Sequence, residues 1–188
     1  MYNSFAALPS IPYNIMTYLA QEDEIIWKML ASNDYDALDK PNVAFGDKLS
    51  MLWKTGPQEP YSVFLSNLVE DVIAESKTIL KCYHYYSHAD NLYTSSTVYA
   101  FDILYGGQMA LVDYNGVPVS RGDLFINRIM TVLNGAYVGG VGTLTFYDDM
   151  SRYDLARSVI GNSKTFTGKQ IFMSVLVGDG GAQGEGCS

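Results

Sequence analysis

Basic residues, cysteines and histidines are all scarce in this chain, and each shortage argues against a class of function. Twelve lysines and arginines stand against twenty aspartates and glutamates, so the formal net charge is -8 at pH 7. Because the basic residues do not cluster along the chain, they offer no patch that would attract nucleic-acid phosphates. The sequence therefore argues against non-specific binding of nucleic acid, although an acidic passage through which DNA moves remains compatible with it.

Two cysteines and two histidines leave little material for disulfides or metal sites. Cys82 lies inside a strand pattern and Cys187 in a glycine-rich tail, so we expect both thiols to be reduced. Cys82, His84 and His88 resemble part of a zinc site. In a strand, however, residues four apart are separated by roughly 13 Å and cannot share one metal ion. We therefore predict no metal site, and the alternative would require this segment to be helical.

Long apolar runs and a basic amino-terminal segment are also missing. No stretch reaches the roughly 20 apolar residues that a transmembrane helix needs, and residues 1–14 lack the basic and apolar regions of a secretory signal. We therefore expect a soluble chain that is not exported by the usual signal route and contacts no membrane. Apolar residues at 48% and charged residues at 17% describe a folded chain rather than a disordered one.

Aromatic residues and glycines are plentiful. Aromatics make up 13% of the chain, with fifteen tyrosines among them, and tyrosine suits partly wet interfaces. The alternative is that many of these tyrosines are core residues of strands. The two glycine clusters, around residues 139–142 and 178–186, match neither the dinucleotide nor the P-loop pattern. We therefore predict no nucleotide and no other cofactor.

The first third of the chain has apolar residues at helical spacing. Two short helices or one bent helix are predicted from Ser10, as N-cap, to about residue 31, with Pro12 in the first turn. The acidic run at residues 22–24 is interpreted as a cap and a solvated face. A further short helix is predicted within residues 45–54, and the two prolines of residues 55–60 end it. We divide the chain into a helical segment (1–60), an α+β assembly domain (61–179) and a flexible tail (180–188).

Alternating patterns predict the strands of the second part. The runs at residues 78–86 and 97–105 are expected to pair as an antiparallel hairpin. After a helix at 120–134, which begins with a cap formed by Ser120 and Asp123, strands are expected at 142–147 and 169–177. Residues 61–73 are ambiguous, and a short helical turn is possible within 151–159. The predicted fold is α+β: an antiparallel four-stranded sheet in β-β-α-β-β order, backed by an amphipathic helix, with a helical amino-terminal part.

Residues 108–119 are predicted to form a long loop with a tight turn at Asn115 and Gly116. Long loops in compact domains are often functional, so we expect this one to contact neighbouring subunits, as we do for the tail. The predicted assembly-interface residues are Met109, Leu111, Tyr114, Tyr105 and Asp179.

Acid-base catalysis is a weaker hypothesis. Asp148, Asp149, Asp154 and Arg157 could converge at the end of a strand. However, the two histidines lie in one segment and no G-x-S-x-G elbow occurs, so no nucleophile, base and orienting group can be named. Solvation, a turn or a subunit salt bridge explains these residues more simply, and we predict no catalytic residue and no enzyme.

Three blocks carry a family resemblance: TVYAFDILYGG, GVPVSRGDLFINRIMTVLNG and SVIGNSKTFTGKQIFMSVLVGD, which together span about residues 97–179. In order and texture they resemble the neck, or head-tail connector, and tail-completion (tail terminator) proteins of tailed bacteriophages. The resemblance implies a small α+β subunit that forms a ring between the portal and the tail. It supplies no active-site residue.

The resemblance implies a virion structural protein at the head-tail junction, assembled in the host cytoplasm. Its partners would be copies of itself, in a closed ring of about six or twelve, and neighbouring portal, adaptor or tail proteins. DNA would pass without sequence-specific binding. Two alternatives remain open, a cellular ligand-binding or regulatory α+β module and an acid-base enzyme.

Overall fold

The first third of the chain forms helices, as the apolar spacing predicts. The computed structural model describes residues 8–58, 60–67, 77–89, 94–146, 157–160 and 166–178. The elements of this part are η2 (Leu8–Ser10), α1 (Ile11–Glu22), α2 (Ile25–Ala31), η3 (Ala37–Asp39) and α3 (Phe45–Ser50). Ser10 holds the predicted N-cap position of α1, and Pro12 lies in its first turn, but the Ser10 side chain makes no capping hydrogen bond.

The acidic residues between α1 and α2 cap a helix, as expected, but they do not form a solvated face. Asp23 Oδ1 accepts a hydrogen bond from the Ile26 N–H at 2.6 Å. Its side chain is fully buried, and Oδ2 lies 2.7 Å from Nη2 of Arg128. Glu24 pairs with Lys48 at 2.7 Å. The prediction of a solvated face is right for Glu22, which is exposed, and wrong for Asp23 and Glu24, because tertiary packing brings distant cations to them, which no local pattern reveals.

The principal sheet has seven strands and is mixed, so the predicted four-stranded antiparallel sheet is wrong. The order is β1-β2-β3-β9-β7-β6, and β8 also pairs with β9. The strands are β1 (Val63–Phe64), β2 (Ile79–Ala89), β3 (Thr94–Gly106), β6 (Tyr137–Val138), β7 (Gly142–Phe146), β8 (Arg157–Ile160) and β9 (Phe166–Gly178). Strand β1 runs parallel to β2, whereas the other pairs are antiparallel.

Two physical causes explain the difference. Strand β9 pairs along its whole length with β3, and its other edge accommodates both β8 and β7. Strands β1 and β6 have two residues each, which is too short for an alternating pattern to show. The predicted β-β-α-β-β order also fails because a second, two-stranded sheet, β4 (Leu111–Tyr114) with β5 (Val117–Ser120), precedes the helix.

The predicted hairpin of β2 and β3 is confirmed, and it is the longest in the described part of the chain. Its register runs from Ile79 opposite Leu104 to Ala89 opposite Ser95, with an irregularity between His84 and Tyr86. Alternate residues of β3 lie on two faces, and both faces are buried. One face joins the large core under the helices, and the other forms two smaller apolar clusters.

Helix α4 (Arg121–Leu133) begins as predicted, because the Ser120 hydroxyl accepts a hydrogen bond from the Asp123 N–H at 3.3 Å. Leu124, Phe125, Ile129 and Leu133 are buried along one stripe of the helix. Gly135 then adopts a φ of 81°, a conformation that glycine accepts without strain. The helix that backs the sheet is therefore confirmed.

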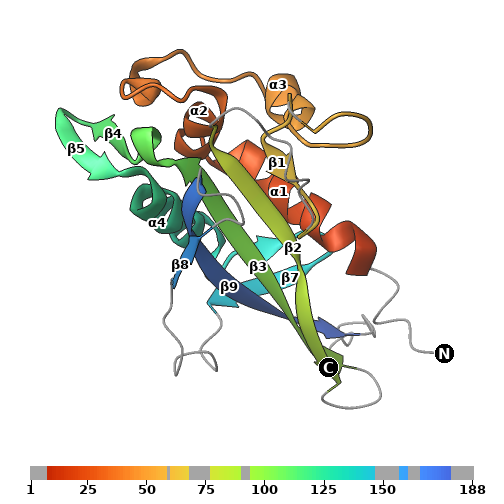
Figure 1. Cartoon of the computed structure of the whole chain (residues 1–188). Helices are drawn as coiled ribbons and strands as arrows, with labels where there is room; N and C mark the ends of the chain where they lie inside the picture. Colours follow the sequence, from red (N-terminus) through yellow and green to blue (C-terminus); the bar gives the residue numbers. More distant parts are fainter. Residues whose placement is uncertain are drawn as a thin grey trace, which may run out of the picture.

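Helices α1, α2 and α4 pack on one face of the principal sheet (Figure 1), and their side chains share one core with the strands. Residues on either side of position 60 contribute to this core, and the division of the chain at that position remains a prediction.

Part of the segment 151–159, where a short helical turn was considered possible, is a strand instead, because β8 takes up residues 157–160. Residues 151–156 lie outside the described part. Within the described residues, no helix is long and apolar enough to cross a membrane.

Candidate functional site

Residues 108–119 form a β-hairpin instead of the predicted loop. The 3-10 turn η4 (Gly107–Met109) leads into β4, which pairs with β5 across the turn at Asn115 and Gly116. These two residues have φ angles of 56° and 78°, as the mirror-image turns of two-residue hairpins require. The tight turn was therefore predicted correctly, but strands of four residues were too short to recognise. We call residues 111–120 the hairpin arm.

The hairpin arm stands out from the body of the molecule beside α4 (Figure 1). Cross-strand partners share a face, and Val112 opposite Val119 packs against the core. Leu111 and Pro118 occupy the opposite face, where both are exposed. Leu111 is 52% exposed, and Val117 near the tip is 56% exposed. The arm therefore presents apolar side chains to solvent, as Tyr137 and Leu176 do elsewhere on the surface at 72% and 62% exposure.

The base of the hairpin arm is held by Arg121, the first residue of α4, whose side chain is fully buried. Its guanidinium donates to five main-chain carbonyl oxygens, at 2.9–3.2 Å, those of Met109, Met29, Ser32, Asn33 and Asp34. Burial lowers the pKa of Arg121, and the charge of Asp34 partly opposes that shift. The planar fork of donors suits this arrangement, because a single ammonium could not reach carbonyls in so many directions. We call Arg121 with these five carbonyls the arginine node.

Two further contacts fix the orientation of the hairpin arm. The Asp113 N–H donates to the Tyr35 carbonyl at 2.8 Å, and the Arg121 N–H donates to the Ala110 carbonyl at 2.8 Å. Gly122 packs closely against the Tyr105 ring, since a Cβ atom there would lie 2.6 Å from the Tyr105 hydroxyl oxygen. The arm is thus joined to the segment after α2 and to the end of β3.

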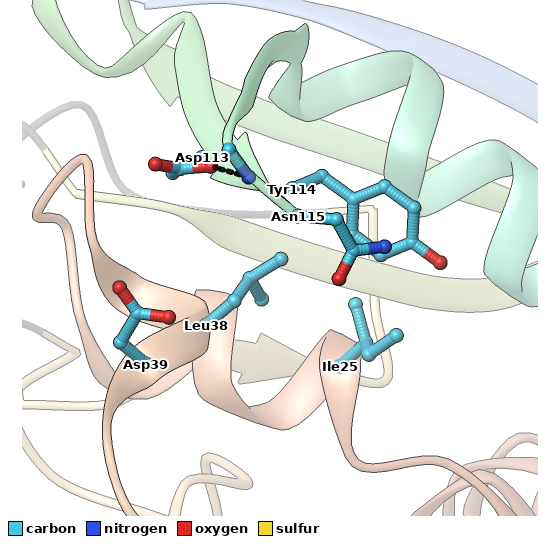
Figure 2. Close-up of a pocket in the computed structure, with 7 residues that line it drawn as sticks. Ile25, Leu38, Asp39, Asp113, Tyr114 and Asn115 are labelled. Atoms are coloured by element: carbon cyan, nitrogen blue, oxygen red, sulfur yellow. Dashed lines mark hydrogen bonds between the residues drawn. The ribbon is translucent and has the colours of Figure 1, made fainter.

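A pocket of about 290 Å³ lies between the hairpin arm and the segment that contains α2 and η3. Figure 2 shows Ile25 and Leu38 opposite Asp113, Tyr114 and Asn115 of the arm, with Asp39 at the side. Gly116 completes the lining. One oxygen of the Asp113 carboxylate accepts a hydrogen bond from the Gly116 N–H at 2.7 Å, which also stabilises the turn.

The structure brings four of the five predicted interface residues to this region. Leu111 is exposed on the hairpin arm and Tyr114 is half-buried beside the pocket. Tyr105 and Met109 are buried, at 5% and 7% exposure, and they support the base of the arm from within. Burial raises the pKa of Tyr105. Asp179 lies outside the described residues, and the role of all five in assembly stays a prediction.

The sequence analysis also considered a metal site at Cys82 and His84 and an acid-base site, and neither involves the hairpin arm. Cys82 is fully buried, which raises the pKa of its thiol, whereas His84 is exposed and its Nε2 contacts the Ser87 hydroxyl at 2.7 Å. Within the described ranges, no three His, Cys, Asp or Glu side chains are placed to hold a metal ion. Asp148, Asp149 and Asp154 lie outside these ranges, as does the side chain of Arg157.

Besides the ion pairs of Asp23 and Glu24, the sequence analysis missed two other buried polar groups. One is the arginine node, for which the sequence offers no signal, since an arginine after a helix cap is ordinary. The other joins Asp102 to the Tyr83 hydroxyl at 3.1 Å and to the Gln170 amide at 2.5 Å. Its signal was visible: Asp102 interrupts the apolar alternation of β3, and a buried carboxylate requires partners.

Comparisons with known proteins place the chain in a family. No curated protein matches it, and no solved structure matches it. A model of the family YomW matches residues 23–175, a range that includes the hairpin arm, the arginine node and the pocket. The resemblance to phage proteins is thereby supported at the level of phage origin. The chain belongs to the YomW family, a phage-derived family named after a protein of a Bacillus prophage region.

Proposed function

We propose that this protein is a structural subunit of a phage particle, located at the head-tail junction, where copies form a ring through which DNA passes. The observation that carries the proposal is the hairpin arm, which presents Leu111 and Val117 to solvent while its base is fixed by Arg121. The phage origin of the family supports the setting.

An exposed apolar face of this kind is more stable when a neighbour covers it. Burying one large apolar side chain contributes about 1.5–3 kcal/mol, so covering Leu111 on one face of the arm, or Val117 near the tip of the other face, would favour association. Because the arm is held in place before association, little conformational entropy is lost when it docks.

A ring follows from repeating one such contact. If the hairpin arm of each copy docks on a different surface of the next, the contact is head-to-tail, and it closes when the rotation between copies closes. The net charge of -8 suits a passage for DNA, since an acidic lumen repels phosphates and the duplex does not adhere.

The test compares the full chain with Leu111→Glu by sedimentation velocity and negative-stain microscopy. We expect rings for the unchanged protein and monomers for Leu111→Glu, because a charge on the apolar face opposes its burial. The matched control is Phe45→Glu, which replaces another exposed apolar residue at 44% exposure, at the start of α3, where an acidic residue is tolerated.

Two results would contradict the proposal. One is a monomer at every concentration that instead binds a small metabolite, which would favour a ligand-binding module. The other is absence of the chain from purified phage particles of the strain that encodes it. A ring that persists in Leu111→Glu would retain the function but remove the hairpin arm from its interface.

A further inference from the structure

The pocket beside the hairpin arm combines an apolar wall with acidic groups. Ile25 and Leu38 supply the apolar wall, Asp39 and Asp113 supply carboxylates, and no basic side chain belongs to the lining. Pockets for drug-sized ligands measure roughly 300–1,000 Å³. At about 290 Å³, this one is at the lower end of that range and has room for one or two side chains of another protein.

The cations near the pocket are already bound to other groups. Lys28 donates to the Leu38 carbonyl at 3.0 Å, and Lys40 pairs with Asp34 and Asp36 at 3.5 and 3.0 Å. In the described part of the chain, the Asp39 carboxylate makes no hydrogen bond or ion pair, and Asp113 uses one oxygen on the hairpin turn. The ammonium of Lys28 keeps its positive charge beside Leu38, so it offsets part of the negative charge of the two pocket carboxylates and leaves the rest for a ligand cation.

We propose that this pocket binds a segment of a different protein in which an apolar residue adjoins a lysine or arginine. The apolar side chain lies against Ile25 and Leu38, while the cation lies near Asp39 and Asp113. A second copy of this chain is the alternative occupant that the test below separates; its net charge of -8 gives it no long-range attraction to this acidic site, whereas a basic segment of a different protein is attracted. The inference does not depend on a place in the phage particle.

The probe is the blocked dipeptide acetyl-leucyl-arginine amide, titrated into the full chain carrying labelled isoleucine and leucine methyl groups. We expect saturable NMR shifts of the Ile25 and Leu38 methyl groups. The matched peptide acetyl-leucyl-glutamate amide has the same apolar group and the opposite charge, and it should bind about three- to tenfold more weakly at low salt.

Two variants with equal charge changes test the role of the carboxylate. Asp39→Lys should remove most of the preference for the arginine peptide, whereas Asp47→Lys, at an exposed position of α3 that does not line the pocket, should retain it. The proposal is overturned if neither peptide shifts the two methyl groups, or if both bind equally well. It is also overturned if the methyl shifts instead follow protein concentration without peptide, which would make a second copy the occupant.

Discussion

The base of the hairpin arm and its outer surface are built in opposite ways. At the base, the charged side chain of Arg121 is fully buried, and carbonyl oxygens from three separate segments surround it. On the outer surface, apolar Leu111 is more than half exposed. Of the two features, the buried charge is the uncommon one, since single exposed apolar residues are ordinary on protein surfaces. We infer that the base determines where the arm lies, whereas the surface serves contacts beyond the chain.

Replacing Arg121 should give the largest loss of stability. Arg121→Met retains the apolar stem but leaves five carbonyls without their donor, two of them buried and three partly buried, so we expect the free energy of unfolding to fall by about 3–5 kcal/mol. Arg121→Lys should cost less, because it retains one cation. Urea denaturation of both variants measures the difference. A loss below about 1 kcal/mol for Arg121→Met would show that the arginine node does not stabilise the base.

Gly122→Ala should have the next largest effect. The added Cβ would lie 2.6 Å from the Tyr105 hydroxyl oxygen and 2.9 Å from Cε1 of that ring, so the ring or the helix must shift. Overpacking of this kind costs about 1–3 kcal/mol. Thermal unfolding measures it, and Gly46→Ala, where no atom lies within 4 Å, is the control.

Adding Tyr105→Phe to Gly122→Ala sharpens this prediction. It removes the closest atom, so it should restore part of the lost stability while the contact with Cε1 remains. No restoration, or an equal loss in Gly46→Ala, would mean that the close packing of α4 against β3 is not the cause.

Tyr83 tests the buried polar group on the other face of the sheet. Burial and the nearby Asp102 charge raise the pKa of Tyr83, so the folded chain retains the phenol proton more tightly than the unfolded chain. The resulting stability is present below about pH 10, the ordinary tyrosine pKa, and is lost as pH rises above it. Lys81 opposes this trend, because burial lowers its pKa.

Tyr83→Phe should therefore lower stability at neutral pH by about 1 kcal/mol, through loss of the hydrogen bond to Asp102. It should also make the decline above pH 10 shallower. Cys82, Tyr99 and Tyr105, whose pKa values burial also raises, leave part of the decline in place. Denaturation midpoints between pH 7 and 11 measure both effects, and an unchanged alkaline decline would contradict the assignment to Tyr83.

Leu111→Glu should have the smallest effect on stability. Its side chain lies on the exposed face of the hairpin arm, so the free energy of unfolding should change by less than about 0.5 kcal/mol. Association should nevertheless be lost. A large loss of stability in the isolated chain would contradict the inference that the surface of the arm, unlike its base, serves contacts beyond the chain.

The sequence predicted the elements that carry long local patterns. Strands β2, β3 and β9 alternate over many residues, and α4 has both a cap and an apolar stripe, so each was recognisable. The arm was missed because each of its strands has four residues, although its turn was identified. The sheet order could not be predicted, because the pairing of β9 with β3, β7 and β8 depends on contacts far apart in the chain.

The candidate site was predicted only where its residues lie within one short stretch of sequence. Leu111 and Tyr114 were selected because long connections often have functions, and they do lie on the hairpin arm and beside the pocket. The pocket itself needs Ile25 and Leu38, and Arg121 needs carbonyls up to 92 residues away in sequence. No spacing rule connects such positions, because only the completed fold brings them together.

The arginine node also has a consequence for the time course of folding. Arg121 can make its hydrogen bonds only after α2, the segment that follows it and α4 have come together, since these partners lie 87 to 92 residues apart. We expect these contacts to form after the rate-limiting step, because the entropy of closing the long loop between them must be lost first. We expect replacement of Arg121 to accelerate unfolding while the folding rate changes little. The arm would then reach its final position last, so that only a completely folded chain presents it to a neighbour.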